Sequence, residues 1–527
     1  MESQIQDCAA AWLLDIRHAP EMECASVLFA KSLFDRELAL SDYQQLPLTT
    51  VLLDDERTPE LILGGSPDSA KRSSDSVFSD SFNSSCLGPK LSPELSEDSA
   101  CASSPIQTDS RTGFSALSVE IPVMPSYWQL KGQLRRIVNS VGNIYGLLGD
   151  IYNCHFKSLL AEVLSLIELS ESAGCVPFVS REHLSHVRCQ TETIARQPRI
   201  TQLPHDYCAS LKHLCDDILV YCTKVLLRYL TESAATDNAT HLSSALDQLS
   251  HLALFGEPIR LKIIQVGAVR LLVSVCRQVD SRRDEVRLAL RCLAVLCSAS
   301  KGCVQLQSLG GLDLVIGIIL EASFLSAVEA AGVLAQLTAP CHSFAALPTT
   351  LPKVISRLLD LCDSCATADT HLLCSAALAN LSMQHNSVVE QLYRENCVLR
   401  LCRAFNTRPC RSVFVREQLA TILSRLSAHG YDQALISQGA IPCLLELLKA
   451  QHPRYRDLCK RIRYKAAICL GTIAARGYGL KAVYENQGFD TLIEVLRMEK
   501  GHRNPVNMIC HSLLSRLQAK YELETYV

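Results

Sequence analysis

The second half of the chain repeats one arrangement of apolar and polar positions. In each copy, Leu or Ile follows a first Leu after two intervening residues, and successive copies start 41 to 47 residues apart. This period is typical of helical units that stack into a solenoid, because one such unit cannot bury its own apolar face. The seven pairs are Leu249 with Leu252, Leu293 with Leu296, Leu334 with Leu337, Leu378 with Leu381, Leu423 with Leu426, Leu470 with Ile473, and Leu514 with Leu517.

A second element lies between the copies, where a glycine precedes an aliphatic stretch with helical spacing. It occurs at Gly267, Gly311, Gly439 and Gly488. A glycine there can end one helix, so each unit presents two apolar faces that only its neighbours can cover. The stretches 439–445 and 376–382 resemble armadillo repeats. The sequence therefore predicts an all-α fold, an armadillo-type right-handed superhelical solenoid over residues 239–521, in preference to a single ordinary helical domain.

Two regions of different composition precede the repeats. Residues 126–238 contain long helical patterns, for example from Tyr127 to Leu169, and we expect this region to cap the first repeat. Residues 66–125 are rich in Ser and Pro with few large apolar side chains, which predicts a disordered linker. The linker contains three Ser-Pro pairs that proline-directed kinases could modify, at Ser66, Ser92 and Ser104.

Composition excludes some classes of function. The chain has 51 basic and 54 acidic side chains, a net charge of -3, which gives no global field for nucleic acid. Its 25 cysteines are scattered through apolar periods, where thiols act as small core residues, and this indicates a reducing compartment. No secretory signal or membrane-spanning run is recognisable. We therefore expect a cytoplasmic protein that does not insert directly into membranes.

Candidate chemistry is sparse. Cys362 and Cys365 form one isolated C-x-x-C without the second pair that a zinc site requires, and they are better explained as core thiols. No nucleophile with a base, paired carboxylates or phosphate-binding loop is recognisable, so we expect no enzyme activity, cofactor or metal. Basic side chains cluster only near Arg461, between His452 and Lys465. This run could bind an acidic peptide, although it is more typical of a solvated helix face.

The N-terminal segment, residues 1–65, has the properties of a ligand. Asp7 can cap a short helix that places Trp12, Leu13 and Ile16 on one side and ends before Pro20. A helix of this length is unstable alone in water, so it should fold against another surface. That surface is either the groove of a partner or this protein's own repeats.

These residues resemble the segment by which Inscuteable proteins bind the tetratricopeptide groove of Pins/LGN. The resemblance continues in the repeats, at 276–278, 289–296 and 375–381, while residues between Lys31 and Asp54 are an insertion relative to the vertebrate pattern. It implies a Pins/LGN-type partner. The implied contact residues are Trp12, Leu13, Asp15, Ile16, Met22, Glu23, Cys24, Leu28, Lys31, Asp54, Asp55 and Glu56.

The last six residues, 522–527, end in Thr-Tyr-Val. PDZ domains bind such tails as an added strand, and here Thr525 and Val527 would be the anchors. The Inscuteable resemblance implies a Bazooka-type PDZ polarity scaffold as the partner.

The combined prediction is an adaptor for asymmetric cell division. It would link Pins/LGN-type spindle-orientation proteins to the polarity complex at the apical cell cortex. The alternative is a catenin-like armadillo scaffold that binds a cytoplasmic peptide in its concave groove. An importin-type receptor is disfavoured, because Trp12 and Trp128 lie outside the repeats and only Asn380 occupies the usual Asn position.

Overall fold

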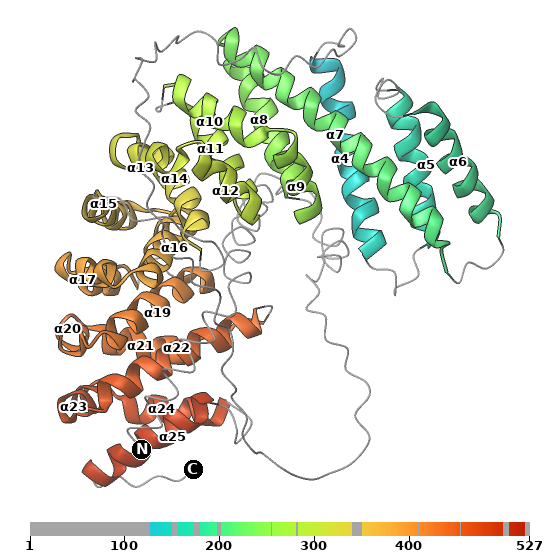
Figure 1. Cartoon of the computed structure of the whole chain (residues 1–527). Coiled ribbons are helices and arrows are strands. Elements are labelled where there is room, and N and C mark those ends of the chain that lie inside the picture. The colour runs from blue at the N-terminus through green and yellow to red at the C-terminus, as the bar shows by residue number, and fades with distance from the viewer. Residues whose placement is uncertain are drawn as a thin grey trace, which may run out of the picture. The chain divides into compact units, whose positions relative to one another are not determined.

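The computed structural model describes residues 127–521, apart from internal gaps at 150–155, 173–179, 198–201, 255, 281–282, 340–349, 406, 408–410, 454 and 499–504. Every regular element in these residues is a helix, and the bar of Figure 1 shows their order along the chain. The predicted all-α class is therefore confirmed.

Four helices precede the repeats: α4 (Tyr127–Gly149), α5 (Phe156–Ser172), α6 (Arg181–Ala195) and α7 (His205–Ala235). α4 packs against α5 and α7, and α6 packs against both α5 and α7. The helical pattern expected from Tyr127 to Leu169 is thus divided between two helices that contact one another. A single helix of that length would leave both apolar faces without a neighbour, whereas two packed helices cover each other.

The repeats consist of short helices that follow one pattern. A short first helix leads into a second helix, and a longer third helix completes the unit. The complete units are α9 (Glu257–Gln265), α10 (Ala268–Gln278) and α11 (Asp284–Leu296); α12 (Ser300–Ser308), α13 (Gly311–Glu321) and α14 (Phe324–Leu337); α17 (Asn386–Arg394), α18 (Cys397–Phe405) and α19 (Val413–Ala428); α20 (Asp432–Ser437), α21 (Ala440–Leu448) and α22 (Arg456–Ala474); and α23 (Gly477–Glu485), α24 (Gly488–Met498) and α25 (Pro505–Tyr521).

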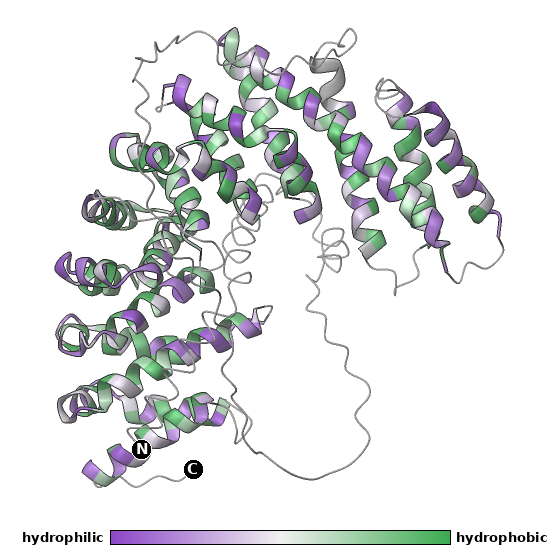
Figure 2. Cartoon of the chain, viewed as in Figure 1, coloured by the Kyte–Doolittle hydropathy of each residue, from purple (hydrophilic) through white to green (hydrophobic). Residues whose placement is uncertain are grey.

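Two further units are described in part. One contributes only its third helix, α8 (Ala239–Ala253), and the other its second and third helices, α15 (Leu351–Ser364) and α16 (Ala368–Gln384). Figure 2 shows hydrophilic residues on the outward sides of the first helices α17, α20 and α23. This three-helix unit is the armadillo pattern, so the predicted armadillo-type solenoid is confirmed.

The third helices form a continuous row. Each packs against the next in the order α8, α11, α14, α16, α19, α22 and α25. All seven predicted apolar pairs lie on these helices, and their side chains are between 0 and 4% exposed. Full burial of such a side chain contributes about 1.5–3 kcal/mol. The repeated Leu positions therefore supply the contacts that hold neighbouring units together.

The turn between the first and second helices uses a left-handed backbone. Gly267 (φ 97°), Gly310 (φ 67°) and Gly439 (φ 84°) take this conformation, and Asn396 and Gln487 do so at the equivalent turns. The sequence placed two of these turns one residue too late, at Gly311 and Gly488. Those two glycines are required for a different reason, since a Cβ on either would lie 2.2–2.3 Å from a side chain of the preceding helix.

A tight corner joins the third helices α11 and α22 to the units that follow them. A Cβ on Gly479 would lie 2.0 Å from the carbonyl oxygen of Ile473, at the end of α22, and one on Gly302 would lie 2.3 Å from that of Leu296. Both glycines are at the third position of a first helix. Neither site can accept a methyl group without a backbone shift, because the clashing atom belongs to the main chain.

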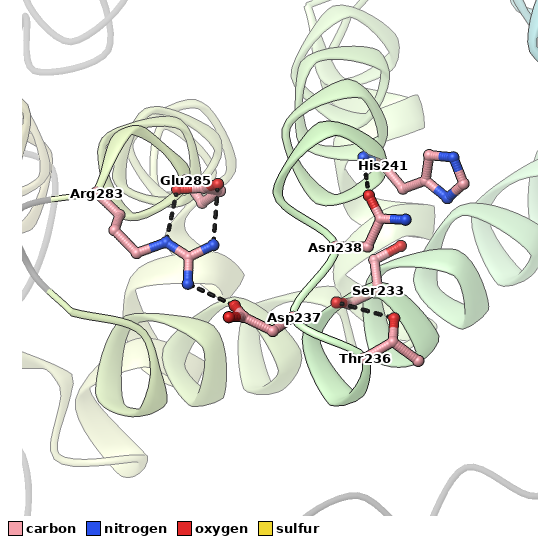
Figure 3. Close-up of polar contacts among 7 residues, drawn as sticks. All are labelled: Ser233, Thr236, Asp237, Asn238, His241, Arg283 and Glu285. Atoms are coloured by element: carbon pink, nitrogen blue, oxygen red, sulfur yellow. Dashed lines mark hydrogen bonds and ion pairs between the residues drawn. The ribbon is translucent and has the colours of Figure 1, made fainter.

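Figure 3 shows the junction between the N-terminal helices and the repeats. The Asn238 side chain caps α8 by accepting a hydrogen bond from the backbone N–H of His241, at 3.2 Å. Asp237, in a left-handed conformation (φ 50°), accepts a hydrogen bond from Arg283, whose guanidinium also contacts Glu285 at the start of α11. One arginine thus joins the α7–α8 turn to the first complete unit.

The corner glycine can be tested with a matched pair of substitutions in α23. Gly479→Ala should lower the free energy of unfolding by about 1–3 kcal/mol, because the new methyl group has to displace backbone. Gly477→Ala is the control, since nothing lies within 4 Å of its Cβ position, and it should stay within about 0.5 kcal/mol of wild type. Urea unfolding followed by circular dichroism measures both. If both substitutions lower the free energy of unfolding by the same amount, the predicted clash at Gly479 is wrong.

Candidate partner-binding surface

The contact residues that the sequence predicts lie outside the described part of the chain. These predictions, together with the disordered linker at 66–125, are therefore neither confirmed nor corrected by the structure. They are Trp12, Leu13, Asp15, Ile16, Met22, Glu23, Cys24, Leu28, Lys31, Asp54, Asp55 and Glu56 of the N-terminal segment, and Thr525 and Val527 of the tail.

Among the described residues, the row of third helices is the surface that extends across all units. One position of the repeat, two residues after the first Leu of each pair, carries hydrogen-bond donors that reach the preceding third helix. Asn380 donates to the carbonyl of Ala335 (2.8 Å), Arg425 to that of Ser382 (3.1 Å) and Arg516 to that of Ala474 (2.7 Å). Carbonyls at a helix C-terminus lack intrahelical partners, so these bonds join successive units.

Asn380 is consequently a structural residue in this chain. It is 6% exposed, and its side-chain amide donates within the protein. Arginine occupies the equivalent position in two later units and adds a positive charge, which suits the negative end of the neighbouring helix. The sequence identified the asparagine at this position but missed Arg425 and Arg516. Both lie two residues after the first Leu of their pair, and this constant spacing in the sequence could have revealed them.

A charged cluster lies between α19 and α22. Glu417, which is 1% exposed, has its Oε1 atom 2.9 Å from Nε of Arg461 and 3.7 Å from Nζ of Lys465. Lys465, 3% exposed, also donates a hydrogen bond to the Thr421 hydroxyl at 2.8 Å. A buried charge is costly unless it is paired, so the two cations compensate the carboxylate and fix α22 against α19.

The basic run from His452 to Lys465 is therefore more than a solvated helix face. Lys465 and Arg461 hold Glu417, and Arg463 donates to the carbonyl of Ala450 at 2.6 Å. Arg456 and Lys460 are exposed, and Lys460 pairs only with the exposed carboxylate of Asp457. The run thus divides into side chains that hold the repeats together and side chains that face solvent.

Charge is distributed unevenly along the row. The third helices α8, α11, α14 and α16 contain five acidic and two basic side chains. The helices α19, α22 and α25 contain two acidic and nine basic side chains, which is a wider basic cluster than the sequence indicated. We call this second group the basic third-helix surface. Its members are Arg416, Arg425, Arg456, Lys460, Arg461, Arg463, Lys465, Arg516 and Lys520, of which Arg425 and Lys465 are buried.

Much of this charge persists although several of the side chains are bonded. Carbonyl oxygens accept from Arg425, Arg463 and Arg516 without cancelling the charge of the guanidinium groups. The carboxylates of Glu417 and Asp457 offset two of the nine cations. The basic third-helix surface therefore keeps a net positive charge, whereas the first four third helices are net acidic.

The described cysteines of the repeats are buried, except Cys365 and Cys402, which are half-buried. Burial raises the pKa of the Cys292 and Cys469 thiols to about 12, so both stay protonated near neutral pH. Cys362 is buried, and Cys365 is half-buried beside it. No group of three or more His, Cys, Asp or Glu side chains in the described residues is arranged to hold a metal ion.

No described helix is, by itself, both long and apolar enough to cross a membrane. Only α12 and α13 taken together meet that criterion, and they are bent by 84° at their junction.

The stacked three-helix units and their row of third helices define an armadillo-type repeat protein. A family model described as "Protein inscuteable C-terminal" matches residues 152–525, so the chain belongs to the inscuteable family. The proteins named "Protein inscuteable homolog" of Mus musculus and Homo sapiens are 25% and 27% identical over 423 residues. These matches cover 74% of this chain and 72% of each relative.

Two solved structures are also similar. One is an engineered protein with a TM-score of 0.44 and 17% identity; the match covers 72% of this chain and 99% of the engineered chain. The other is a designed armadillo repeat protein with a TM-score of 0.38 and 20% identity; the match covers 47% of this chain and 99% of the designed chain.

The buried charge cluster makes a testable prediction. Glu417→Gln leaves Lys465 buried without its carboxylate and should lower the free energy of unfolding by about 3–5 kcal/mol. The matched control is Asp457→Asn. It removes the exposed ion pair between Asp457 and Lys460 within α22 and should cost less than about 1 kcal/mol. Replacing both buried partners, as Glu417→Leu with Lys465→Met, should recover most of the loss. An unfolding transition of Glu417→Gln that coincides with that of Asp457→Asn would rule out the pairing.

Proposed function

We propose that this protein is a non-enzymatic adaptor of the inscuteable type, which brings a spindle-orientation protein to a polarity complex. The observation that carries the proposal is the family match over residues 152–525, which spans the repeats and most of the helices before them. An array of units joined by apolar pairs offers a long surface for binding partners. Such an array acts by bringing partners together.

The N-terminal segment is the proposed site for a Pins/LGN-type tetratricopeptide partner. Its support comes from the residues themselves, since the family model begins at residue 152. Trp12, Leu13 and Ile16 form an apolar side of a short helix, and the acidic stretch Asp54–Glu56 follows later in the chain. A superhelical groove can hold the helix by its apolar side and the acidic stretch by basic side chains.

The C-terminal tail is the proposed site for a Bazooka-type PDZ scaffold. The hydroxyl of Thr525 and the aliphatic side chain of Val527 have the spacing that PDZ grooves bind. With one partner at each end, the protein would link the two at the apical cell cortex. It would be cytoplasmic and recruited there by these contacts.

The first interaction predicts a strong effect of one side chain. A fragment of residues 1–70 should bind the tetratricopeptide domain of a Pins/LGN protein in isothermal calorimetry. Trp12→Ala should weaken binding by about 2 kcal/mol, about 30-fold in Kd, because a buried indole is a typical anchor. Leu46→Ala, an apolar residue of the insertion between Lys31 and Asp54, is the control and should bind like wild type. Loss of affinity in neither variant, or in both equally, counts against the assignment.

The second interaction depends on the last side chain. Val527→Asp in the full chain should weaken binding to a PDZ domain of the polarity scaffold more than about tenfold, a loss of at least about 1.4 kcal/mol. The change places a charge in the pocket for the terminal aliphatic group. Glu524→Gln, three residues earlier, should retain binding. Fluorescence polarisation measures both, and an unchanged affinity of Val527→Asp would exclude a PDZ-type contact.

A second candidate function is favoured by the basic third-helix surface. A catenin-like scaffold would bind an acidic cytoplasmic tail there, and α19, α22 and α25 carry the required charge. Pull-downs with the N-terminal segment and with the repeats discriminate the two. The adaptor proposal requires the tetratricopeptide partner to be captured by the N-terminal segment, whereas the scaffold requires an acidic tail to be captured by the repeats.

A further inference from the structure

Acidic and basic side chains are unevenly divided between the two parts of the chain, although the net charge of the whole chain is small. Residues 1–125 contain 20 acidic and 8 basic side chains, whereas residues 126–527 contain 34 acidic and 43 basic ones. The two parts therefore carry net charges of -12 and +9, which cancel to the -3 of the whole chain. Opposite charges within one polypeptide attract each other, and the covalent link keeps their local concentration near the millimolar range.

The basic excess of the larger part is concentrated on α19, α22 and α25. The positions most accessible to another segment are Arg456 and Lys460 in the first turns of α22 and Lys520 in the last turn of α25, all exposed. Figure 2 shows the N-terminal end of α22 as hydrophilic. The adjoining helix α25 packs against α22 and presents Met508, which is 54% exposed. Charge and an apolar contact thus occur on neighbouring helices.

The occupant that suits this surface is the first part of the chain, residues 1–44. These residues hold 8 acidic and 3 basic side chains, so they carry a net charge of -5. They also contain Trp12, Leu13 and Ile16 at helical spacing. Exposed ion pairs contribute only about 0–1 kcal/mol each, so a segment that stays bound needs apolar side chains as well. Residues 1–44 combine both properties.

The chain between this segment and the repeats is long enough. Residues 45–126 make a connection of 82 residues, and a coil of that length would have a typical end-to-end distance of about 50 Å. Six helix-to-helix steps lead from α4, where this connection ends, through α8 to α22. At about 8–10 Å a step, this path measures about 50–60 Å. The tether therefore reaches the basic third-helix surface without being fully extended.

We infer that residues 1–44 bind the basic third-helix surface of the same molecule when no partner is present. Residues 1–44 would then be unavailable to a partner, and a tetratricopeptide partner would have to displace the basic third-helix surface from them. This competition rests on the proposed function, whereas the intramolecular contact itself does not. Because the contact is electrostatic in part, it weakens as salt shortens the screening length from about 8 Å at about 0.15 M to about 3 Å at about 1 M.

The chain's two tryptophans allow a direct test. In a full-length Trp128→Phe variant, Trp12 is the single indole and reports its own environment. We expect a blue-shifted emission and protection from acrylamide quenching that do not depend on protein concentration. Adding Arg456→Glu with Lys460→Glu should remove the protection, and so should high salt. Arg270→Glu with Lys301→Glu is the control, because it makes the same change of charge at exposed positions on α10 and α12.

Carbodiimide crosslinking of the monomeric full chain identifies the occupant. We expect carboxylates of residues 1–44, such as Glu21 and Glu23, to join Lys460 and Lys520 within one molecule. The inference is overturned if Trp12 is equally exposed in all variants, if both double variants release it equally, or if the lysines join residues 45–125 or a second molecule instead.

The two proposals can fail independently. If the fragment 1–70 binds the tetratricopeptide domain but Trp12 of the intact chain is exposed, only the intramolecular contact is wrong. If Trp12 is protected through Lys460 and Arg456 but the fragment binds no such domain, the contact stands and the partner assignment fails. Where both hold, adding the tetratricopeptide domain should abolish the crosslinks to Lys460.

Discussion

The packing of each third helix against the next is the contact on which the structure depends. A single unit has two apolar faces and cannot cover either alone, so its stability comes from its neighbours. The Leu pairs of the third helices meet this requirement, because all of them are buried in the row from α8 to α25. The corner glycines are a consequence, since Gly302 and Gly479 allow the next unit to start directly against the end of a third helix.

Polar groups on the same row have a different role. Asn380, Arg425 and Arg516 bind carbonyls that the preceding helix leaves unpaired, and the cluster around Glu417 compensates one buried carboxylate with two cations. These bonds hold the units together but cancel little of the positive charge. The row of third helices is therefore basic over α19, α22 and α25, where these stabilising cations lie. This basic part provides the long-range attraction on which both the scaffold alternative and the intramolecular contact depend.

The armadillo fold was predictable because its signals are local and repeated, whereas the inscuteable family was recognised by the resemblance of particular stretches such as 289–296 and 375–381. The spacing of the Leu pairs indicated the number and kind of units, and the glycine turns indicated where second helices begin, although at Gly311 and Gly488 the turn lies one residue earlier. The candidate surface was only partly predictable. A basic run near Arg461 is visible in the sequence, but Arg425 lies 36 residues before Arg461 and Arg516 lies 55 residues after it.

The sequence by itself determined the all-α class, the repeat period and the opposite charges of the two parts of the chain. Each of these follows from residue types and spacing alone. The tertiary structure decided which cations hold the repeats together and which face solvent, as the contrast between Lys465 and Lys460 on one helix shows. That choice depends on which residue of another unit, here Glu417, lies opposite, and stacking brings together positions that are distant in the sequence.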